Sequence, residues 1–412
     1  MTGPLRILCT EILPWKRLKA RAEADLGFAL EFHEHDFVTA QRIAATRPDG
    51  YDIYDQCFHN LDIVWNWGAV QPIDTTRIEA WDEVSDLTRR GGFDGRRLGV
   101  GDHPITRLYV QSDGTLSDAE STAISMLPTV HNFDSFALNL ELVRVDVDRE
   151  VTSWAEILQP RWKGRVALVD EPAIGVFDLA MALRAVGLFA CRDLGNLTIG
   201  EIDQLMARGR ELVQSGHLAR FWRTATEATD RLAAGELAIS SLWSPSVVAL
   251  KSRRLRVRQA VPVEGYRGWH GGLCLANHLT GGRRDMAYAW LNWFLSGWAG
   301  AVMARQGYYM SVPGRVRAYL DPAEWNYWYE GLPAQRPLPG PTGDFAIREG
   351  EVRSGGSYRA RAARVAVWNS TMDEHNYLVR RWHELVRLAE TRTERRGPYQ
   401  PNPKETPCPM SD

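Results

Sequence analysis

Short apolar runs alternate along the chain with longer stretches in which apolar residues recur every three or four positions. Residues 5–8 and 51–54 are mostly apolar stretches of strand length, whereas residues 14–26 place Leu18 and Ala22 on one helical face. This alternation of strand-like and helix-like segments predicts an α/β protein with largely parallel sheets.

A second block with the same alternation begins near residue 135. Near residue 273 the chain returns to the first block. Glycine and proline residues mark several of the expected helix boundaries. The remaining expected elements are strands at 29–32, 165–169, 237–242 and 273–276 and helices at 39–45, 62–67, 153–158, 173–186, 200–216, 245–250, 284–295, 298–306 and 374–390. We expect Thr39 to cap the helix at 39–45.

With 412 residues, of which 44% are hydrophobic and 24% charged, the chain is long enough for about two or three domains. The formal net charge of −2 argues against a protein that binds nucleic acid by electrostatic attraction. The five cysteines are too scattered for a disulfide framework or a zinc site, and a core of this size needs neither. We therefore expect no metal and no cofactor.

The sequence gives no indication of a membrane anchor. No apolar run approaches the roughly 18 residues that a membrane-spanning helix needs. The opening residues, MTGPLRIL, lack both an apolar signal core and a cleavage site. Either an export signal is missing from this sequence or the protein stays in the cytoplasm, and the sequence leaves both possibilities open.

Six stretches carry more specific information. They read CTEILP at 9–14, GYDI at 50–53 with GAVQPID at 68–74, VTSWAEILQPRWKGRVAL at 151–168, GELAI at 235–239 with LWS at 242–244, PVEG at 262–265 with GW at 268–269, and AYAWLNWFL at 287–295 closed by GY at 307–308. In order and spacing they resemble the polyamine-type, or spermidine/putrescine-binding, solute-binding proteins of bacterial ABC importers. Residues 333–372 do not match and read as an insertion.

That resemblance implies a two-lobed, type II periplasmic-binding-protein fold, in which two mixed or parallel sheets are built from discontinuous parts of the chain. The first lobe would comprise residues 1–130 and 265–312. The second lobe would comprise residues 135–262, and a C-terminal segment, 315–390, would pack on it. Residues 391–412, rich in arginine and proline, would form a disordered tail.

The same resemblance implies a protein that closes around a small molecule between its lobes and performs no chemistry on it. Its partners would be the small-molecule ligand and the transmembrane subunits of an ABC permease, with no nucleic acid. It would be a monomer located in the periplasm.

The resemblance also implies a set of ligand-binding positions. Six residues match the family's pattern: Thr10, Glu11, Glu171, Trp243, Trp269 and Tyr308. Three positions depart from it. Cys9 replaces an aromatic residue, an acidic residue is lost around Gly175, and the family's Trp-x-Asp reads Trp269-His270-Gly271, so that His270 lies beside the missing carboxylate.

Other candidates follow from position in the expected sheet. Asp55, Cys57 and His59 follow the third expected strand, 51–54, and open α/β sheets bind ligands at the carboxyl ends of their strands. Asn132 and Asp134 lie on the expected crossover between the lobes, where they could contact the ligand or only form a hinge.

The departures bear on the ligand. A charge-assisted hydrogen bond is typically worth about 1.5–3 kcal/mol. Losing carboxylates therefore weakens the binding of a multivalent cation severely. We expect a ligand other than spermidine or putrescine: a singly charged, zwitterionic or larger polar molecule, for which Gly175 and Gly271 leave space.

Two other classes of protein remain open from the sequence alone. One is a cytoplasmic ligand sensor on the same fold. The other is an enzyme that would use Asp55, His59, Glu171 or His270 as acid or base, although no recognisable catalytic motif supports it. Trp243 and Trp269 could also be core residues of their lobes, and Glu11 could serve only the first turn of a helix.

Overall fold

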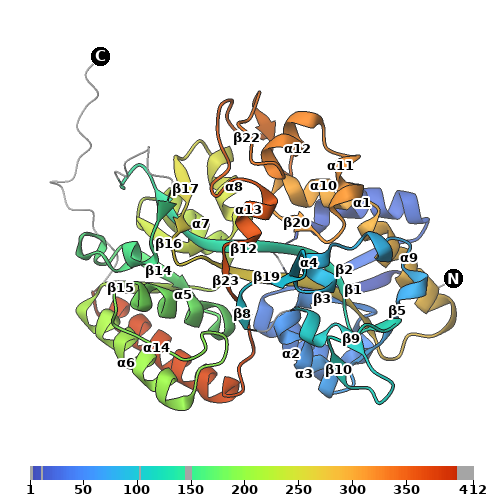
Figure 1. The fold of residues 1–412 in the computed structure, drawn as a ribbon, viewed down its shortest axis with the longest axis horizontal. Coiled ribbons are helices and arrows are strands. Elements are labelled where there is room, and N and C mark those ends of the chain that lie inside the picture. The colour runs from blue at the N-terminus through green and yellow to red at the C-terminus, as the bar shows by residue number, and fades with distance from the viewer. Residues whose placement is uncertain (1–2, 11–12, 102–103, 144–150, 397–412) are drawn as a thin grey trace.

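The computed structural model describes residues 3–10, 13–101, 104–143 and 151–396. Two lobes lie side by side in Figure 1, and the long strand β12 (Leu127–Asn139) runs between them. The first lobe carries strands β1 to β3 on the right, and the second lobe carries β14 to β16 on the left. The two-lobed α/β fold expected from the resemblance is confirmed.

The sheet of the first lobe has the order β2-β1-β3-β19-β12. The first three strands are parallel, and β19 is antiparallel to β3. The strands are β1 (Leu5–Thr10), β2 (Leu30–His35), β3 (Ile53–Cys57) and β19 (Tyr266–Ala276). The helices of this lobe are α1 (Trp15–Leu26), α2 (Phe37–Thr46), α3 (Leu61–Asn66), α4 (Asp86–Arg89), α9 (Gly281–Leu295) and α10 (Trp298–Arg305).

The sheet of the second lobe has the order β15-β14-β16-β12. Its strands β14 (Val166–Val169), β15 (Leu218–Trp222) and β16 (Ile239–Leu242) are parallel, and both faces are buried, which explains the unbroken apolar run of β14. Its helices are α5 (Pro172–Ala185), α6 (Ile199–Ser215), α7 (Ala225–Ala233) and α8 (Ser244–Ser252).

Strand β12 belongs to both sheets. Its first part, up to Asp134, pairs with β19, where Asp134 lies opposite Arg267. From Ser135 onward it pairs with β16, where Ser135 lies opposite Leu242. Within β12, Asp134 thus pairs with the first-lobe sheet and the next residue, Ser135, pairs with the second-lobe sheet. The two sheets are therefore joined by a continuous set of backbone hydrogen bonds. Residues near this switch lie at the junction of the lobes.

The sequence placed the start of α2 incorrectly. We expected Thr39 to be the N-cap, but the helix begins at Phe37 and Asp36 is the capping residue. The Asp36 carboxylate accepts a hydrogen bond of 2.9 Å from the Thr39 backbone N–H. The capping group is therefore a carboxylate three residues upstream, which satisfies an otherwise unpaired donor of the first turn.

The segment after α10 adds to both lobes. Helices α11 (Pro313–Arg317) and α12 (Pro322–Trp328) contact α10 of the first lobe, whereas strand β22 (Phe345–Ile347), paired with β21 (Leu338–Pro339), contacts α8 of the second. This segment includes residues 333–372, which the sequence resemblance to the family identifies as an insertion. It also contains α13 (Tyr358–Ala362) and β23 (Val365–Trp368), which pairs in parallel with β19.

The last helix, α14 (His375–Arg396), packs against α5, α6 and β15 of the second lobe through Leu378, Trp382 and Leu385. We expected the helix to end at residue 390 and a disordered tail to follow. The helix instead continues to Arg396, and the Thr393 hydroxyl donates a hydrogen bond to the Ala219 carbonyl of β15. Residues 397–412 lie outside the described part of the chain.

The remaining strands are short and lie at the edges of the sheets or in small hairpins. They are β4 (Val70–Gln71), β5 (Ile73–Asp74), β6 (Gly92–Phe93), β7 (Arg96–Arg97), β8 (Val100–Gly101), β9 (Tyr109–Val110), β10 (Leu116–Ser117), β11 (Ala123–Ile124), β13 (Val151–Thr152), β17 (Val257–Gln259), β18 (Val261–Pro262) and β20 (Tyr309–Met310).

Candidate ligand-binding site

The register of three neighbouring strands decides which side chains share a face. Gly271 of β19 lies opposite Cys57 of β3, and Trp269 of β19 lies opposite Asn132 of β12. Residues directly opposite one another point to the same side of a sheet, and alternate residues of a strand do too. Asp55, Cys57, Trp269, Asn132 and Asp134 therefore share one face at the junction of the lobes.

Hydrogen bonds tie this face together. The indole Nε1–H of Trp269 donates to Asp134 Oδ2 at 2.6 Å. Asn132 Nδ2 donates to Asp134 Oδ1 at 2.9 Å and to the Ser244 hydroxyl oxygen at 2.7 Å. Because Ser244 opens α8, these bonds link the crossover strands to the second lobe. Burial raises the pKa of Asp134 to about 6, although Arg267 and the indole N–H act in the opposite direction.

Tyr308 extends the cluster from the first lobe. Its ring packs edge-on against Trp269, with the ring centroids 5.0 Å apart. Burial raises the pKa of the phenol well above its usual value, and the nearby carboxyl groups of Asp134 and Asp55 act in the same direction. Within the described chain its hydroxyl has no hydrogen-bond partner.

Thr10, the last residue of β1, lies beside Asp55 in the middle of β3. Both are buried, and burial raises the pKa of Asp55 to about 8, with the Thr10 backbone N–H offsetting part of that effect. Burial, followed by the charge of Asp55, also raises the pKa of the Cys57 thiol well above its ordinary value. The predicted ligand residue Glu11, next to Thr10, lies outside the described residues.

The second lobe contributes two residues that immediately precede helices. Glu171 precedes α5 and Trp243 precedes α8. Burial raises the pKa of Glu171 to about 8, with the charge of Arg267 opposing it. The Trp243 ring packs edge-on against Trp222 at 4.9 Å and contacts Phe37, the first residue of α2 in the other lobe, at 5.9 Å.

The two tryptophans on which the sequence argument depends are both nearly buried. Trp269 belongs to the hydrophobic core of the first lobe and Trp243 to a core of the second. Both rings also make contacts at the junction of the lobes. Trp243 contacts Phe37 of the other lobe, and Trp269 bonds to Asp134, where β12 changes sheets. Each ring thus has one side in a core and contacts at the junction.

His270 does not join this face. It lies between Trp269 and Gly271 on β19, so its side chain points to the opposite side of the sheet. There its ring stacks on His131 with centroids 4.7 Å apart, and its Nε2 lies 3.2 Å from the Thr88 hydroxyl oxygen. The alternation of strand side chains therefore removes His270 from the candidate ligand residues.

His59 lies at the edge of the cluster, on the 3₁₀ turn that follows β3. Burial lowers its pKa to about 3, and the charges of His375 and Arg267 add to that effect. The imidazole is therefore neutral at physiological pH, and the Thr371 hydroxyl donates a hydrogen bond to its backbone carbonyl.

The space expected at Gly175 is used for packing. A Cβ atom at this position would lie 2.4 Å from the Trp382 ring and 2.5 Å from the Val169 carbonyl oxygen. The glycine thus lets α5 approach both β14 and α14, and it does not enlarge a ligand site. At Gly271 a Cβ atom would lie 3.2 Å from the Val130 side chain, so this glycine also leaves little space beside it.

Sequence reasoning missed Arg267. It is fully buried on β19, two residues before Trp269 and therefore on the same face. Its Nε donates to Asp178 Oδ1 of α5 at 3.0 Å, and its Nη1 donates to Asn369 Oδ1 at 3.2 Å. The sequence does contain a sign of its role: Arg267 lies two residues before Trp269, which was already expected to face the ligand, and residues two apart in a strand share a face.

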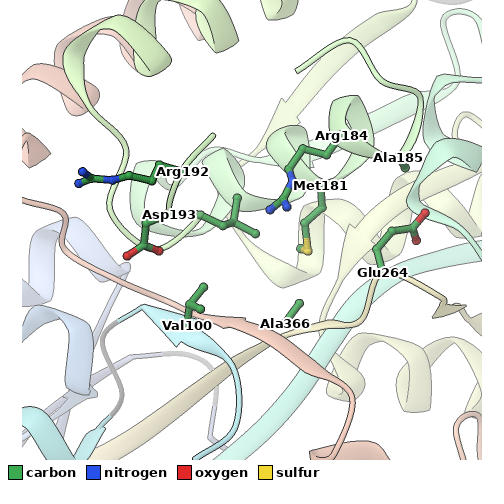
Figure 2. Close-up of a pocket in the computed structure, with 9 residues that line it drawn as sticks. Val100, Met181, Arg184, Ala185, Arg192, Asp193, Glu264 and Ala366 are labelled. Atoms are coloured by element: carbon green, nitrogen blue, oxygen red, sulfur yellow. The ribbon is translucent and has the colours of Figure 1, made fainter. Parts of the chain in front are cut away.

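A separate pocket of about 820 Å³ lies between the C-terminal half of α5 and strands β8 and β23 (Figure 2). Arg184 and Met181 extend from α5 toward Val100 and Ala366, and Glu264 lies at another side of the pocket. None of the predicted ligand residues lines it.

No group of three or more His, Cys, Asp and Glu side chains in the described ranges is arranged to hold a metal ion. Among the helices of the described chain, none combines the length and the apolar character needed to cross a membrane.

Solved structures share this architecture. The spermidine/putrescine ABC transporter substrate-binding protein PotD from Streptococcus pneumoniae has a TM-score of 0.61 at 12% identity, covering 95% of this chain and 99% of that one. The binding protein AgtB from A. tumefaciens R10, in complex with agropinic acid, has a TM-score of 0.60 at 15% identity, covering 94% and 99%. A structure described as a GABA receptor has a TM-score of 0.59 at 14% identity, covering 93% and 98%.

At these identities the likeness establishes the fold, which is that of two-lobed substrate-binding proteins of ABC transporters. Residues 113–328, just over half of the chain, match the model of the bacterial extracellular solute-binding proteins. The chain belongs to that family. No curated protein matches it in sequence. The resemblance to the spermidine/putrescine-binding proteins is thereby confirmed at the level of family and fold.

Proposed function

We propose that this chain is the solute-binding component of an ABC importer, which captures a small polar organic ligand between its lobes and delivers it to the permease without chemical change. The observation that carries the proposal is that Trp269 bonds to Asp134 and packs on Tyr308 where the lobes join. From the second lobe, Ser244, the neighbour of Trp243, accepts a hydrogen bond from Asn132. The charge of Arg267 acts on Glu171 as it does on Asp134. Aromatic faces and carboxyl groups together suit a ligand that carries an amine.

We also propose that the ligand is neither spermidine nor putrescine. The position of the family's Trp-x-Asp carboxylate is Gly271, and His270 beside it faces the other side of the sheet. The ligands named with the similar structures, spermidine/putrescine, agropinic acid and GABA, span cations and carboxylate-bearing molecules. Of these, the carboxylate-bearing kinds suit a site that has lost part of its negative charge.

A thermal-shift screen of amines, amino acids and sugar derivatives tests the binding function. A ligand at 100 times its Kd stabilises the folded protein by about 2.7 kcal/mol. We expect Trp269→Leu to lower the affinity for the best compound by roughly tenfold or more, because it removes both ring and N–H. Trp290→Leu is the matched control, since Trp290 is buried in the same core away from the junction.

Two outcomes would reject the proposal: no compound stabilises the wild-type protein, or a bound compound is converted to a product. Trp269→Leu and Trp290→Leu weakening binding equally would instead reject the site. For location and assembly, we propose a periplasmic monomer that presents its closed lobes to the permease. Cell fractionation and light scattering after gel filtration test these two points, and a protein confined to the cytoplasm would favour a sensor.

A further inference from the structure

The buried arginine at the junction is only partly satisfied. Arg267 uses Nε for Asp178 and Nη1 for Asn369, and its guanidinium is fully shielded from solvent. Its Nη2 has no hydrogen-bond partner among the described residues. A buried, charged donor without an acceptor is costly, so such an atom marks a place where another group completes the bonding.

Groups from both lobes surround this arginine. Its charge acts on Cys57 and His59 at the end of β3, on Asp134 of β12 and on Glu171 at the start of α5. The guanidinium therefore lies at the junction and not within either lobe alone. Its ion pair with Asp178 and its bond to Asn369 hold it in one orientation, so that Nη2 is fixed in place.

Several other buried polar atoms near the junction also lack partners in the part of the chain that the structure describes. They include the hydroxyl of Tyr308 and Oε2 of Glu171. A guanidinium N–H and a phenol O–H are donors that suit a carboxylate, whereas the carboxyl group of Glu171 accepts from an ammonium. The junction thus offers separate groups for the two charges of one ligand.

Building on the proposed function, we propose that Arg267 binds a carboxylate of the ligand through Nη2, so that the ligand is a zwitterion. Its amine lies toward Glu171 and the Trp269 ring. A plain dicarboxylate would place its second carboxylate toward Asp134 and Glu171, where it meets carboxyl groups instead of a cation, which is unfavourable. A polyamine would place positive charge against Arg267 and leave its free N–H unpaired.

Paired ligands test this directly. Isothermal titration compares the tightest zwitterion from a panel of amino acids, 4-aminobutyrate and N-carboxyalkyl amino acids with its own methyl ester. We expect the acid to bind wild-type protein roughly tenfold or more tightly than the ester, because the ester lacks the charged acceptor. Spermidine, putrescine and succinate complete the panel, and we expect all three to bind more weakly than the zwitterion.

Variants of Arg267 distinguish a direct contact with the ligand from a purely structural role of this residue. Arg267→Lys keeps the charge next to Asp178 but loses the planar fork, so the ratio of ester to acid dissociation constants should fall to within about twofold of one. The double variant Arg267→Gln/Asp178→Asn removes both buried charges together and should give the same ratio. Arg361→Lys is the matched control, a fully buried arginine that donates to the Phe133 carbonyl, and it should leave the ratio unchanged.

Each other result has a defined meaning. If acid and ester bind equally to wild type, or if the ratio survives in both Arg267 variants, the carboxylate does not meet Arg267 and the inference fails. If only spermidine or putrescine binds, the inference also fails while the binding function stands. If no compound of this panel binds, the inference is rejected, and if the wider thermal-shift screen also finds none, the proposed function is rejected as well.

Discussion

Trp269 and Asp134 are joined by a 2.6 Å hydrogen bond at the point where β12 leaves one sheet for the other. The indole N–H supplies a donor to a carboxyl group that is shielded from solvent, and Asn132 supplies the second. The bond therefore orients the ring that faces the junction and satisfies a buried acceptor at the same time.

Trp269→Phe tests the energetic role of this bond. The variant keeps an aromatic ring but leaves Asp134 Oδ2 without its donor, so we expect a loss of about 1–3 kcal/mol in the free energy of unfolding at pH 7.5. Losing the donor raises the pKa of Asp134 further above its value of about 6. The loss should therefore shrink at pH 5, where the carboxyl group is already protonated.

Urea denaturation at the two pH values measures this difference. Trp154→Phe is the control, because the Trp154 indole donates a 2.9 Å hydrogen bond to the uncharged carbonyl of Gly265. Its loss should be about 1 kcal/mol at both pH values. A pH-independent loss in Trp269→Phe would contradict the role of the Asp134 charge.

Asp55 should make the protein less stable as the pH rises. Its folded pKa of about 8 lies above the ordinary value of 3.8, chiefly because of burial. The folded state therefore keeps a proton that the unfolded state has lost, and the stabilisation present at low pH disappears as the pH rises toward 8. Each pH unit in this window costs at most about 1.4 kcal/mol from one such group.

The comparison with Asp55→Asn isolates this effect. The amide cannot ionise, so between pH 6.5 and 8 the free energy of unfolding of the variant should fall less steeply than that of the wild type. Buried histidines with lowered pKa, such as His59 and His131, act in the opposite direction but mainly below pH 6.5. Parallel curves for the two proteins would show that Asp55 is ionised throughout this range.

Gly175→Ala should destabilise the protein, although alanine is the better helix former. The new methyl group would meet the Trp382 ring and the Val169 carbonyl at distances below 3 Å. Overpacking of this kind costs about 1–3 kcal/mol. Gly200→Ala is the control, since nothing lies within 4 Å of its Cβ position on α6, and it should leave stability unchanged or raise it by up to about 1 kcal/mol. Thermal unfolding of both variants measures this difference. Equal midpoints for Gly175→Ala and Gly200→Ala would contradict the packing argument.

Phe37→Ala should favour separation of the lobes. Phe37 and Trp243 are in contact across the junction, and their ring centroids lie 5.9 Å apart. Removing the ring takes apolar contact from the closed arrangement but not from an open one. The radius of gyration from small-angle scattering should rise in the ligand-free variant. The exposed neighbour Val38 provides the control Val38→Ala, and an unchanged radius in Phe37→Ala would show that this contact does not hold the lobes together.

Much of the secondary structure followed from the sequence pattern. Helices α5, α6, α9 and α10 and strands β1, β3 and β14 lie within a few residues of the expected ranges. Strand β19 was seen only at its end, over 273–276, because its first half, Tyr-Arg-Gly-Trp-His-Gly, has no regular alternation. Strand β23 was missed because it gains its partners, β19 and β8, only from distant parts of the chain.

The sequence by itself determined the alternation of strands and helices, the family and the aromatic and acidic residues available for a ligand, because these depend on local periodicity and motif order. Only the tertiary structure decided which side of the sheet each residue faces. Strand register places Trp269, and not its neighbour His270, on the face of Asn132 and Cys57. Long-range pairing buries Arg267 with Asp178 instead of leaving it in water. Burial of a charged group depends on what surrounds it in space, and no pattern of neighbouring residues along the chain contains that information.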